Sequence, residues 1–312
     1  MRHLGNKLDA VRKGKPQEVK RKFILAFEGY RTEVQYFKGI SDNRSKLGIS
    51  SLIEVCPLNR YPIQSGSSDP GTILDILEEY VEFLDSGKCR LDLFINSFIN
   101  DTVTERDLPR IRYKAEELII EVKERLQPLC DGEGVINEME KAAEICSETY
   151  RRIFGVAEEV YFNGPERIDY RKGRDIICVI VDRDADTRGP AECKEFFSRC
   201  KKNGFEAYMT NPCFEMWLLL HFDEILYERA EDLLLNKKTG NTRYTEQRLD
   251  EIVRSYPANN GYCKTDLDFG CFMHRVDNAI KNEKMFCRDT GRMIKNVGSN
   301  IGSLITKMRD RN

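Results

Sequence analysis

The chain has 312 residues, of which 40% are hydrophobic and 33% charged, and its formal net charge at pH 7 is −2. It is long enough to bury a core as one large domain or two smaller ones. No apolar run approaches the roughly 18–20 residues that cross a bilayer, and no signal-peptide core is present. Eleven scattered cysteines and three histidines exclude a disulfide framework and a histidine-rich zinc site, so we expect a cytoplasmic protein.

Charge is distributed unevenly along the chain. Residues 1–22 carry eight Lys and Arg against two acids, and residues 275–312 carry nine bases against four acids. Residues 101–160 carry fifteen acids against nine bases. Basic ends fit a polyanionic partner such as nucleic acid. For residues 1–22 alone, a solvated arm is an equally good explanation.

Four short apolar runs predict strands, and a helical pattern follows each. The predicted strands are Phe23–Phe27, Leu52–Cys56, Ile176–Val181 and Phe205–Met209. The helices expected after them span residues 32–40, 72–84, 190–203 and 213–222. This repeated order predicts an α/β fold, with a parallel sheet flanked by helices and right-handed crossovers.

Helical patterns without strands fill the rest of the chain. Residues 111–126 and 135–153 predict a helical hairpin, inserted within residues 90–163, whose acidic face is a partner surface, a lid or merely solvated. Helices are also expected at residues 246–256, 272–284 and 299–309. The expected organisation is a basic arm (1–22), an α/β core (23–89 and 164–223), the insertion (90–163) and a helical C-terminal region (224–312).

Acidic residues follow the first and third predicted strands. In extended chain Asp182 and Asp184 point to one side, about 6–7 Å apart, and Glu28 ends the first strand. Open α/β sheets bind ligands at the carboxyl ends of their strands, and a few hard oxygen ligands suit Mg²⁺ or Mn²⁺. The alternative is a set of solvated turn acids, because Asp-x-Asp recurs by chance.

Three stretches together resemble the RloB-like family. They are Glu28-Gly29-x-x-Thr32-Glu33-x-x-Tyr36-Phe37, Val181-Asp182-Arg183-Asp184 and Asn211-Pro212-Cys213-Phe214-Glu215-x-Trp217-Leu218-Leu219-Leu220-His221-Phe222. Tyr262-x-Lys264 and Asn300–Leu304 match the family's tail more faintly. The resemblance does not cover residues 90–165, and its most specific motif is Asn-Pro-Cys-Phe-Glu.

The resemblance implies a TOPRIM-like catalytic domain, similar to those of topoisomerases, primases and OLD-family nucleases. It implies that Glu28 is a general base or acid and a metal ligand, that Asp182 and Asp184 are metal ligands, and that Asp186 is an auxiliary ligand. It also implies a nuclease toxin effector of prokaryotic anti-phage systems, as in AbiL and PARIS. RNA, tRNA in particular, is then the expected substrate rather than DNA, and an ATPase of the same system the expected partner, while homo-oligomerisation stays open.

Three further residues have two readings each. Arg183 and Lys264 contact substrate phosphate or form internal salt bridges. Glu215 supports the metal site or is stabilised by a helix dipole. Glu33 is expected as another auxiliary or substrate-binding residue. We expect His221 to be structural, and Trp217, Leu218 and Phe222 to lie in the core.

Two rival functions remain. Asp184-Ala185-Asp186-Thr187 also matches the motif of haloacid-dehalogenase-type phosphatases, in which Asp184 would be the nucleophile. That fold places the motif on its first strand, whereas here a long strand-helix region precedes it. The second rival is a catalytically silent scaffold that docks an ATPase through the acidic hairpin. Retention of Glu28, Asp182 and Asp184 argues against it.

Overall fold

The computed structural model describes residues 21–29, 31–55, 70–103, 108–157, 161–162, 164–165, 170–183, 189–256 and 261–310. The predicted basic arm therefore lies almost entirely outside the described residues. Asp184 and Asp186 also lie outside the described residues.

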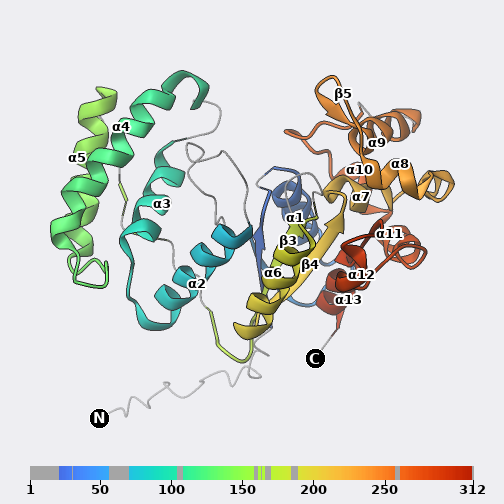
Figure 1. Ribbon diagram of the computed structural model, residues 1–312, viewed down its shortest axis with the longest axis horizontal. Coiled ribbons are helices and arrows are strands. Elements are labelled where there is room, and N and C mark those ends of the chain that lie inside the picture. Colours follow the sequence, from blue (N-terminus) through green and yellow to red (C-terminus); the bar gives the residue numbers. More distant parts are fainter. Residues whose placement is uncertain are drawn as a thin grey trace, which may run out of the picture.

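The predicted α/β fold is confirmed: helices flank a mostly parallel sheet of five strands in the order β2-β1-β3-β4-β7 (Figure 1). Strands β1 (Lys22–Phe27), β2 (Leu52–Val55), β3 (Ile176–Asp182) and β4 (Glu206–Asn211) run parallel. The short β7 (Gly298–Ser299) pairs antiparallel with β4. The sequence does not predict β7, since two residues carry no periodicity, and the last helix begins at Ile301 rather than at the expected Ser299.

Side chains of the central strands alternate between two cores. Ile24, Ala26 and Val179 belong to the core on one face of the sheet, whereas Leu25 and Ile180 belong to the core on the other. A strand buried on both faces reads as a continuous apolar run, because neither face needs polar side chains. This is why the runs at 23–27 and 176–181 predict β1 and β3 correctly.

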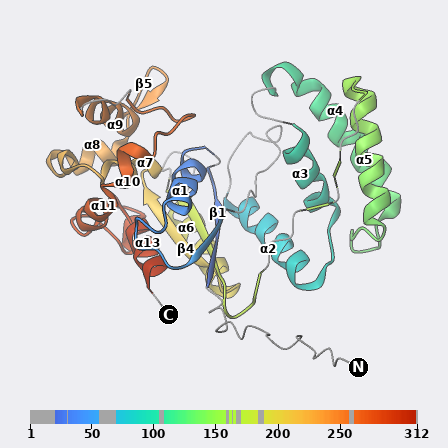
Figure 2. The ribbon, with the colours of Figure 1, turned by 180° about the vertical axis from the view of Figure 1, so that it is seen from behind.

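Helices α2 (Pro70–Ser86) and α6 (Pro190–Lys202) cover one face, and three helices extend the core beyond α2 (Figures 1 and 2). They are α3 (Leu91–Thr102), α4 (Leu108–Leu126) and α5 (Met139–Phe154). The unpredicted helix is α3, which precedes the expected hairpin of α4 and α5. All of its buried residues except Leu93 recur at helical spacing: Leu91, Phe94, Ile95, Phe98 and Ile99.

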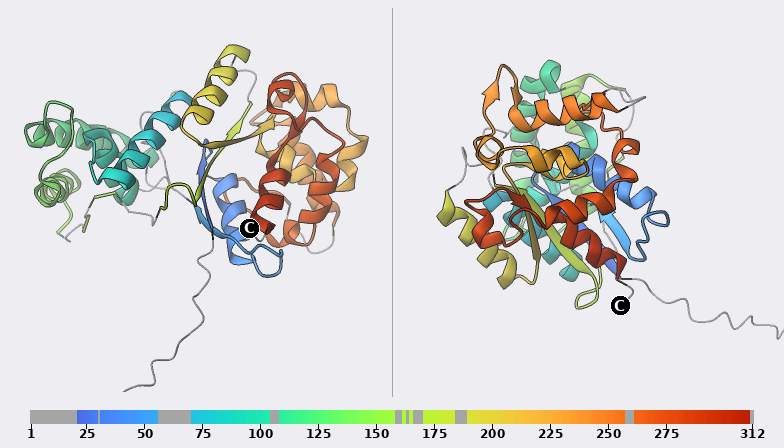
Figure 3. Two further views of the ribbon diagram at one scale, coloured as in Figure 1. Left: turned by 90° about the horizontal axis from the view of Figure 1, so that it is seen from below. Right: turned by 90° about the vertical axis from the view of Figure 1, so that its right-hand side faces the viewer.

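Helices α1 (Thr32–Asp42), α7 (Phe214–Leu219) and the C-terminal helices cover the other face, at the opposite end of the molecule from α4 and α5 (Figure 3). The larger C-terminal helices are α9 (Tyr244–Ser255), α11 (Val276–Glu283) and α13 (Ile301–Arg309). The smaller elements are η1 (Gln127–Leu129), η2 (Asp223–Tyr227), α8 (Ala230–Leu235), β5 (Lys238–Thr239), β6 (Thr242–Arg243), α10 (Gly270–Met273) and α12 (Thr290–Met293).

Two predicted helices had the wrong extent. The helix expected at residues 213–222 ends at Leu219, where the chain turns toward η2. The single helix expected at residues 272–284 is two, because the chain turns at His274 and Arg275 between α10 and α11. Within the described ranges, no helix has the length and apolarity needed to cross a membrane.

Candidate functional site

The carboxyl ends of β1 and β3 bring Glu28 and Asp182 into direct contact. These strands pair in parallel, with Phe27 opposite Ile180. The Glu28 N–H donates to the Ile180 carbonyl at 3.0 Å. One residue beyond Val181, the Asp182 N–H donates to the Glu28 carboxylate, Oε2, at 3.2 Å. Two acids that are 154 positions apart in the sequence are therefore neighbours at one edge of the sheet.

The remaining expected metal ligands, Asp184 and Asp186, lie in the segment 184–188, outside the described residues. Among the residues that are described, no three His, Cys, Asp or Glu side chains are grouped so as to hold a metal ion. The described part of the chain thus brings together two of the expected carboxylate donors. Asp184, the third expected donor, lies outside this part of the chain.

Thr210 is a neighbour of Asp182 that sequence analysis missed. It lies opposite Asp182 in the pairing of β3 with β4, and its hydroxyl donates to Asp182 Oδ1 at 2.6 Å. Thr210 is fully buried. Finding it required the register between β3 and β4, and the predicted fourth strand ended at Met209, two residues before the end of β4 at Asn211.

Glu33 lies in the first turn of α1 and is 8% exposed. Its carboxylate packs so closely over Gly29 that a Cβ at position 29 would collide with it. Burial, with the nearby charges of Glu215 and Glu28, raises the pKa of Glu33 to about 7. Gly29 is therefore needed for close approach, and Glu33 adds a third acid to this edge of the sheet.

Glu215, in the first turn of α7, is 2% exposed and fully partnered. Its Oε1 accepts a hydrogen bond from the Tyr262 hydroxyl at 2.8 Å and pairs with the Lys264 ammonium at 3.2 Å. Burial raises the pKa of Glu215, but Lys264 and hydrogen bonds from Cys213 and Tyr262 outweigh it, so the net pKa lies below its usual value. Glu215 is thus an ionised carboxylate held inside the protein.

The segment around Lys264 ties this site to α1. The Lys264 ammonium also contacts Glu246 Oε1 at 3.1 Å. The backbone carbonyl of Lys264 accepts a hydrogen bond from Gln35 Nε2 at 3.2 Å. The Tyr262 hydroxyl lies 3.2 Å from Thr32 Oγ1. Of the two readings for Lys264, the structure displays the internal salt bridges.

Arg183 and His221 also make internal contacts. Arg183 is 5% exposed, and its Nε donates to the Ile294 carbonyl at 3.1 Å. His221 is fully buried, and its Nε2 lies 3.1 Å from the Tyr36 hydroxyl. The rings of Trp217 and Phe272 stack edge-on against the imidazole of His221. The contacts of Arg183 and His221 are therefore with other parts of the protein core.

The electrostatics of the site are dominated by gathered carboxylates. Burial raises the pKa of Asp182 well above its usual range, and the charges of Glu33, Glu28 and Glu215 raise it further. The Thr210 hydroxyl opposes the rise. Such a cluster of like charges is relieved by a bound cation or by protons.

Comparison with known proteins yields a match to one family model, described as RloB-like protein, over residues 23–308. No curated protein and no solved structure matches the chain. Because the family model covers nearly the whole chain, including residues 90–165 that the motifs left out, this protein belongs to the RloB-like family.

Proposed function

We propose that this protein is a Mg²⁺-dependent nuclease of TOPRIM type that cleaves RNA, tRNA in particular, as the toxin effector of a prokaryotic anti-phage system. The observation that carries the proposal is the contact of Glu28 with Asp182 at the carboxyl ends of two neighbouring parallel strands. Family membership and the motif resemblance supply the reaction class.

The donor chemistry at this edge suits a hard divalent cation. Glu28 and Asp182 offer carboxylate oxygens, and the raised pKa of Asp182, caused by burial and by three other acids, reflects negative charge that a cation would offset. Glu28 and Asp182 would hold Mg²⁺ together with Asp184. When bound, Mg²⁺ supplies charge stabilisation on phosphoryl oxygens and lowers the pKa of water.

Each residue of the chain then has a distinct task. Glu28 holds or moves a proton at its carboxylate oxygen while it remains next to the Asp182 backbone. The Thr210 hydroxyl fixes one oxygen of Asp182 and thereby sets the orientation of the whole carboxylate. Lys264 and Tyr262 keep Glu215 charged and in place behind this edge.

Substrate and partner follow from charge and from the resemblance. The C-terminal segment 275–312, with nine bases against four acids, and the basic residues 1–22 suit a polyanion such as RNA. The acidic residues 101–160, which include α4 and α5, are the proposed docking surface for an ATPase partner.

The test is RNA sequencing of cells after induction of wild type, Glu28→Gln or Asp182→Asn, with Glu195→Gln on α6 as a matched control. We expect tRNA cleavage and toxicity for wild type and the control and neither for the site variants, at equal far-UV circular dichroism. Equal toxicity of wild type and Glu28→Gln, without RNA cleavage, would favour the scaffold instead.

A further inference from the structure

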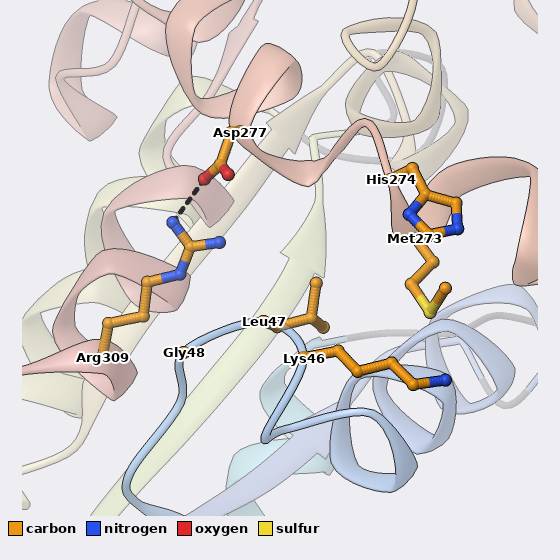
Figure 4. Close-up of a pocket in the computed structure, with 7 residues that line it drawn as sticks. All are labelled: Lys46, Leu47, Gly48, Met273, His274, Asp277 and Arg309. Atoms are coloured by element: carbon orange, nitrogen blue, oxygen red, sulfur yellow. Dashed lines mark hydrogen bonds and ion pairs between the residues drawn. The ribbon is translucent and has the colours of Figure 1, made fainter.

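A pocket of about 420 Å³ lies far from the acidic edge of the sheet. It is lined by Lys46, Leu47, Gly48, Met273, His274, Asp277 and Arg309 (Figure 4). Residues 46–48 lead into the start of β2, whereas Glu28 follows the end of β1. Because β1 and β2 are parallel, these two positions lie at opposite edges of the sheet.

Arg309, on α13, has hydrogen-bond donors to spare. Its Nη1 pairs with Asp277 Oδ1 at 2.5 Å. Its Nε has no acceptor among the described residues but is buried, so the donors that a ligand in the pocket can reach are those of the other terminal nitrogen. Figure 4 shows the other terminal nitrogen pointing away from Asp277, into the space above Leu47. A guanidinium carries five N–H donors, so Arg309 can serve an anion without giving up Asp277.

The rest of the lining favours an anion that also has an apolar part. Lys46, His274 and Met273 lie on the side of the pocket away from Arg309, with Leu47 between (Figure 4). Lys46 is exposed and makes no ion pair with the described part of the chain. Among the lining residues, Asp277 is the single acid against two permanent cations.

We propose that this pocket binds a phosphate-bearing ligand of mononucleotide size. The phosphate lies on Arg309, the base or sugar packs against Leu47 and Met273, and Lys46 closes the far rim. The volume falls within the range of small-molecule sites, well above that of an inorganic phosphate. A phosphate monoester carries close to two negative charges at pH 7, and the lining sets two permanent cations, Lys46 and Arg309, against the one charge of Asp277.

The experiment is calorimetric titration of the full chain with AMP, adenosine and inorganic phosphate. We expect saturable AMP binding, with adenosine at least about tenfold weaker because it lacks the charge-assisted contacts. Lys46→Glu should weaken AMP binding at least about tenfold. Asp277→Asn should strengthen it, because it frees Arg309 Nη1. Arg309→Lys, which keeps the charge but loses the planar set of guanidinium N–H donors, should weaken AMP binding.

The matched control is Lys202→Glu, which makes the same charge change at an exposed position on α6, across the sheet. AMP binding no tighter than adenosine binding, or equal effects of Lys46→Glu and Lys202→Glu, would overturn the proposal. If Arg309→Lys does not fold, Lys46→Glu and Asp277→Asn, which change exposed residues, still test the proposal.

The source of the phosphate is settled by competition. A short single-stranded RNA that displaces AMP, and whose own binding is lost in Lys46→Glu, identifies a nucleic-acid chain as the ligand; failure to displace identifies a free nucleotide. Glu28→Gln should bind AMP normally, so the pocket and the proposed nuclease site are tested separately.

Discussion

The Lys264 ammonium and the Glu215 carboxylate form an ion pair at 3.2 Å, although Glu215 is 2% exposed. Lys264 belongs to the chain between α9 and α10, and Glu215 to α7. The Tyr262 hydroxyl, from the same chain segment, also donates to Glu215. The C-terminal region is therefore built into the sheet edge that carries Glu28 and Asp182, through contacts with α7 and α1.

Replacing Lys264 by Met should destabilise the protein by about 1–2 kcal/mol, because the buried Glu215 loses its counter-ion. We expect less than for a fully buried pair, because the Lys264 side chain is 50% exposed and Glu215 keeps Tyr262. Urea unfolding measures the change. Lys238→Met, at an exposed position on β5, is the control.

A double-mutant cycle of Lys264→Met with Glu215→Gln isolates the pair itself. The two changes should be less than additive, since an uncharged amide at position 215 no longer needs a counter-ion. Strict additivity would mean that the contact is incidental.

Gly298→Ala should destabilise the protein by about 1–3 kcal/mol, the usual cost of forcing atoms into a packed site. A Cβ at Gly298 would collide with the backbone carbonyl of Cys287, and that carbonyl accepts the Ser299 N–H at 3.1 Å. The strain would fall on β7 and its pairing with β4. Thermal unfolding of Gly132→Ala, where a Cβ meets no atom within 4 Å, provides the comparison. Equal melting temperatures for the two variants would contradict this account.

The centre of the sheet could be predicted because β1 and β3 are buried on both faces and show as apolar runs. The meeting of Glu28 with Asp182 follows from the same runs, since parallel strands in one sheet end at one edge. Thr210 could not be found in this way, because its contact with Asp182 depends on the register of β4. The antiparallel β7 is too short to have a pattern.

Helix α3 could have been predicted from the sequence but was not. Its buried apolar positions are spaced as in any amphipathic helix, so the information was present in residues 91–99. The periodic pattern of α3 is shorter than those of α4 and α5, and it is these longer patterns that predict the hairpin. Roles such as that of Lys264 were left open because a lysine beside a phosphate and a lysine beside two acids look alike in sequence.

His221 should make the protein acid-sensitive. Its Nδ1 faces the carbonyls of Trp217 and Leu218, so Nδ1 carries the proton and Nε2 accepts from the Tyr36 hydroxyl. Burial lowers the pKa of His221 to about 3, from the 6.5 of an exposed histidine. Between these values the unfolded chain binds a proton that the folded chain does not. Stability should therefore fall by roughly 1.4 kcal/mol per pH unit as the pH drops from 6.5 toward 3.

The measurement is the free energy of unfolding of wild type and His221→Gln from pH 7 to pH 4. The difference between them should shrink as the pH falls, because glutamine does not titrate. The exposed His274→Gln is the control and should track wild type. A difference that does not change with pH would refute the buried neutral imidazole.

Glu283 should make the stability of the protein depend on pH in the opposite direction to His221. It is 1% exposed, its Oε1 accepts the Gly302 N–H of α13 at 2.8 Å, and burial raises its pKa to about 7. Between pH 4.5 and 7 the folded chain holds a proton that the unfolded chain has lost. This group therefore favours the folded state most below pH 4.5, and its contribution declines by roughly 1.4 kcal/mol per unit up to pH 7. Glu283→Gln keeps an acceptor for Gly302 and should remove this decline; identical pH slopes for the variant and wild type would exclude the role.

Thr210→Val tests how Asp182 is held, given the proposed nuclease. Valine matches the shape of threonine but removes the 2.6 Å hydrogen bond to Asp182 Oδ1, in a position with no exposure to solvent. We expect about 1 kcal/mol of lost stability and, because Asp182 is no longer oriented, an increase of roughly tenfold in the Mg²⁺ concentration that supports half-maximal RNA cleavage. Thr210→Ser keeps the hydroxyl and should restore the Mg²⁺ requirement even though it leaves a methyl-sized gap. A Mg²⁺ requirement that is the same in Thr210→Val and wild type would mean that Asp182 does not hold the metal through the carboxylate that Thr210 orients.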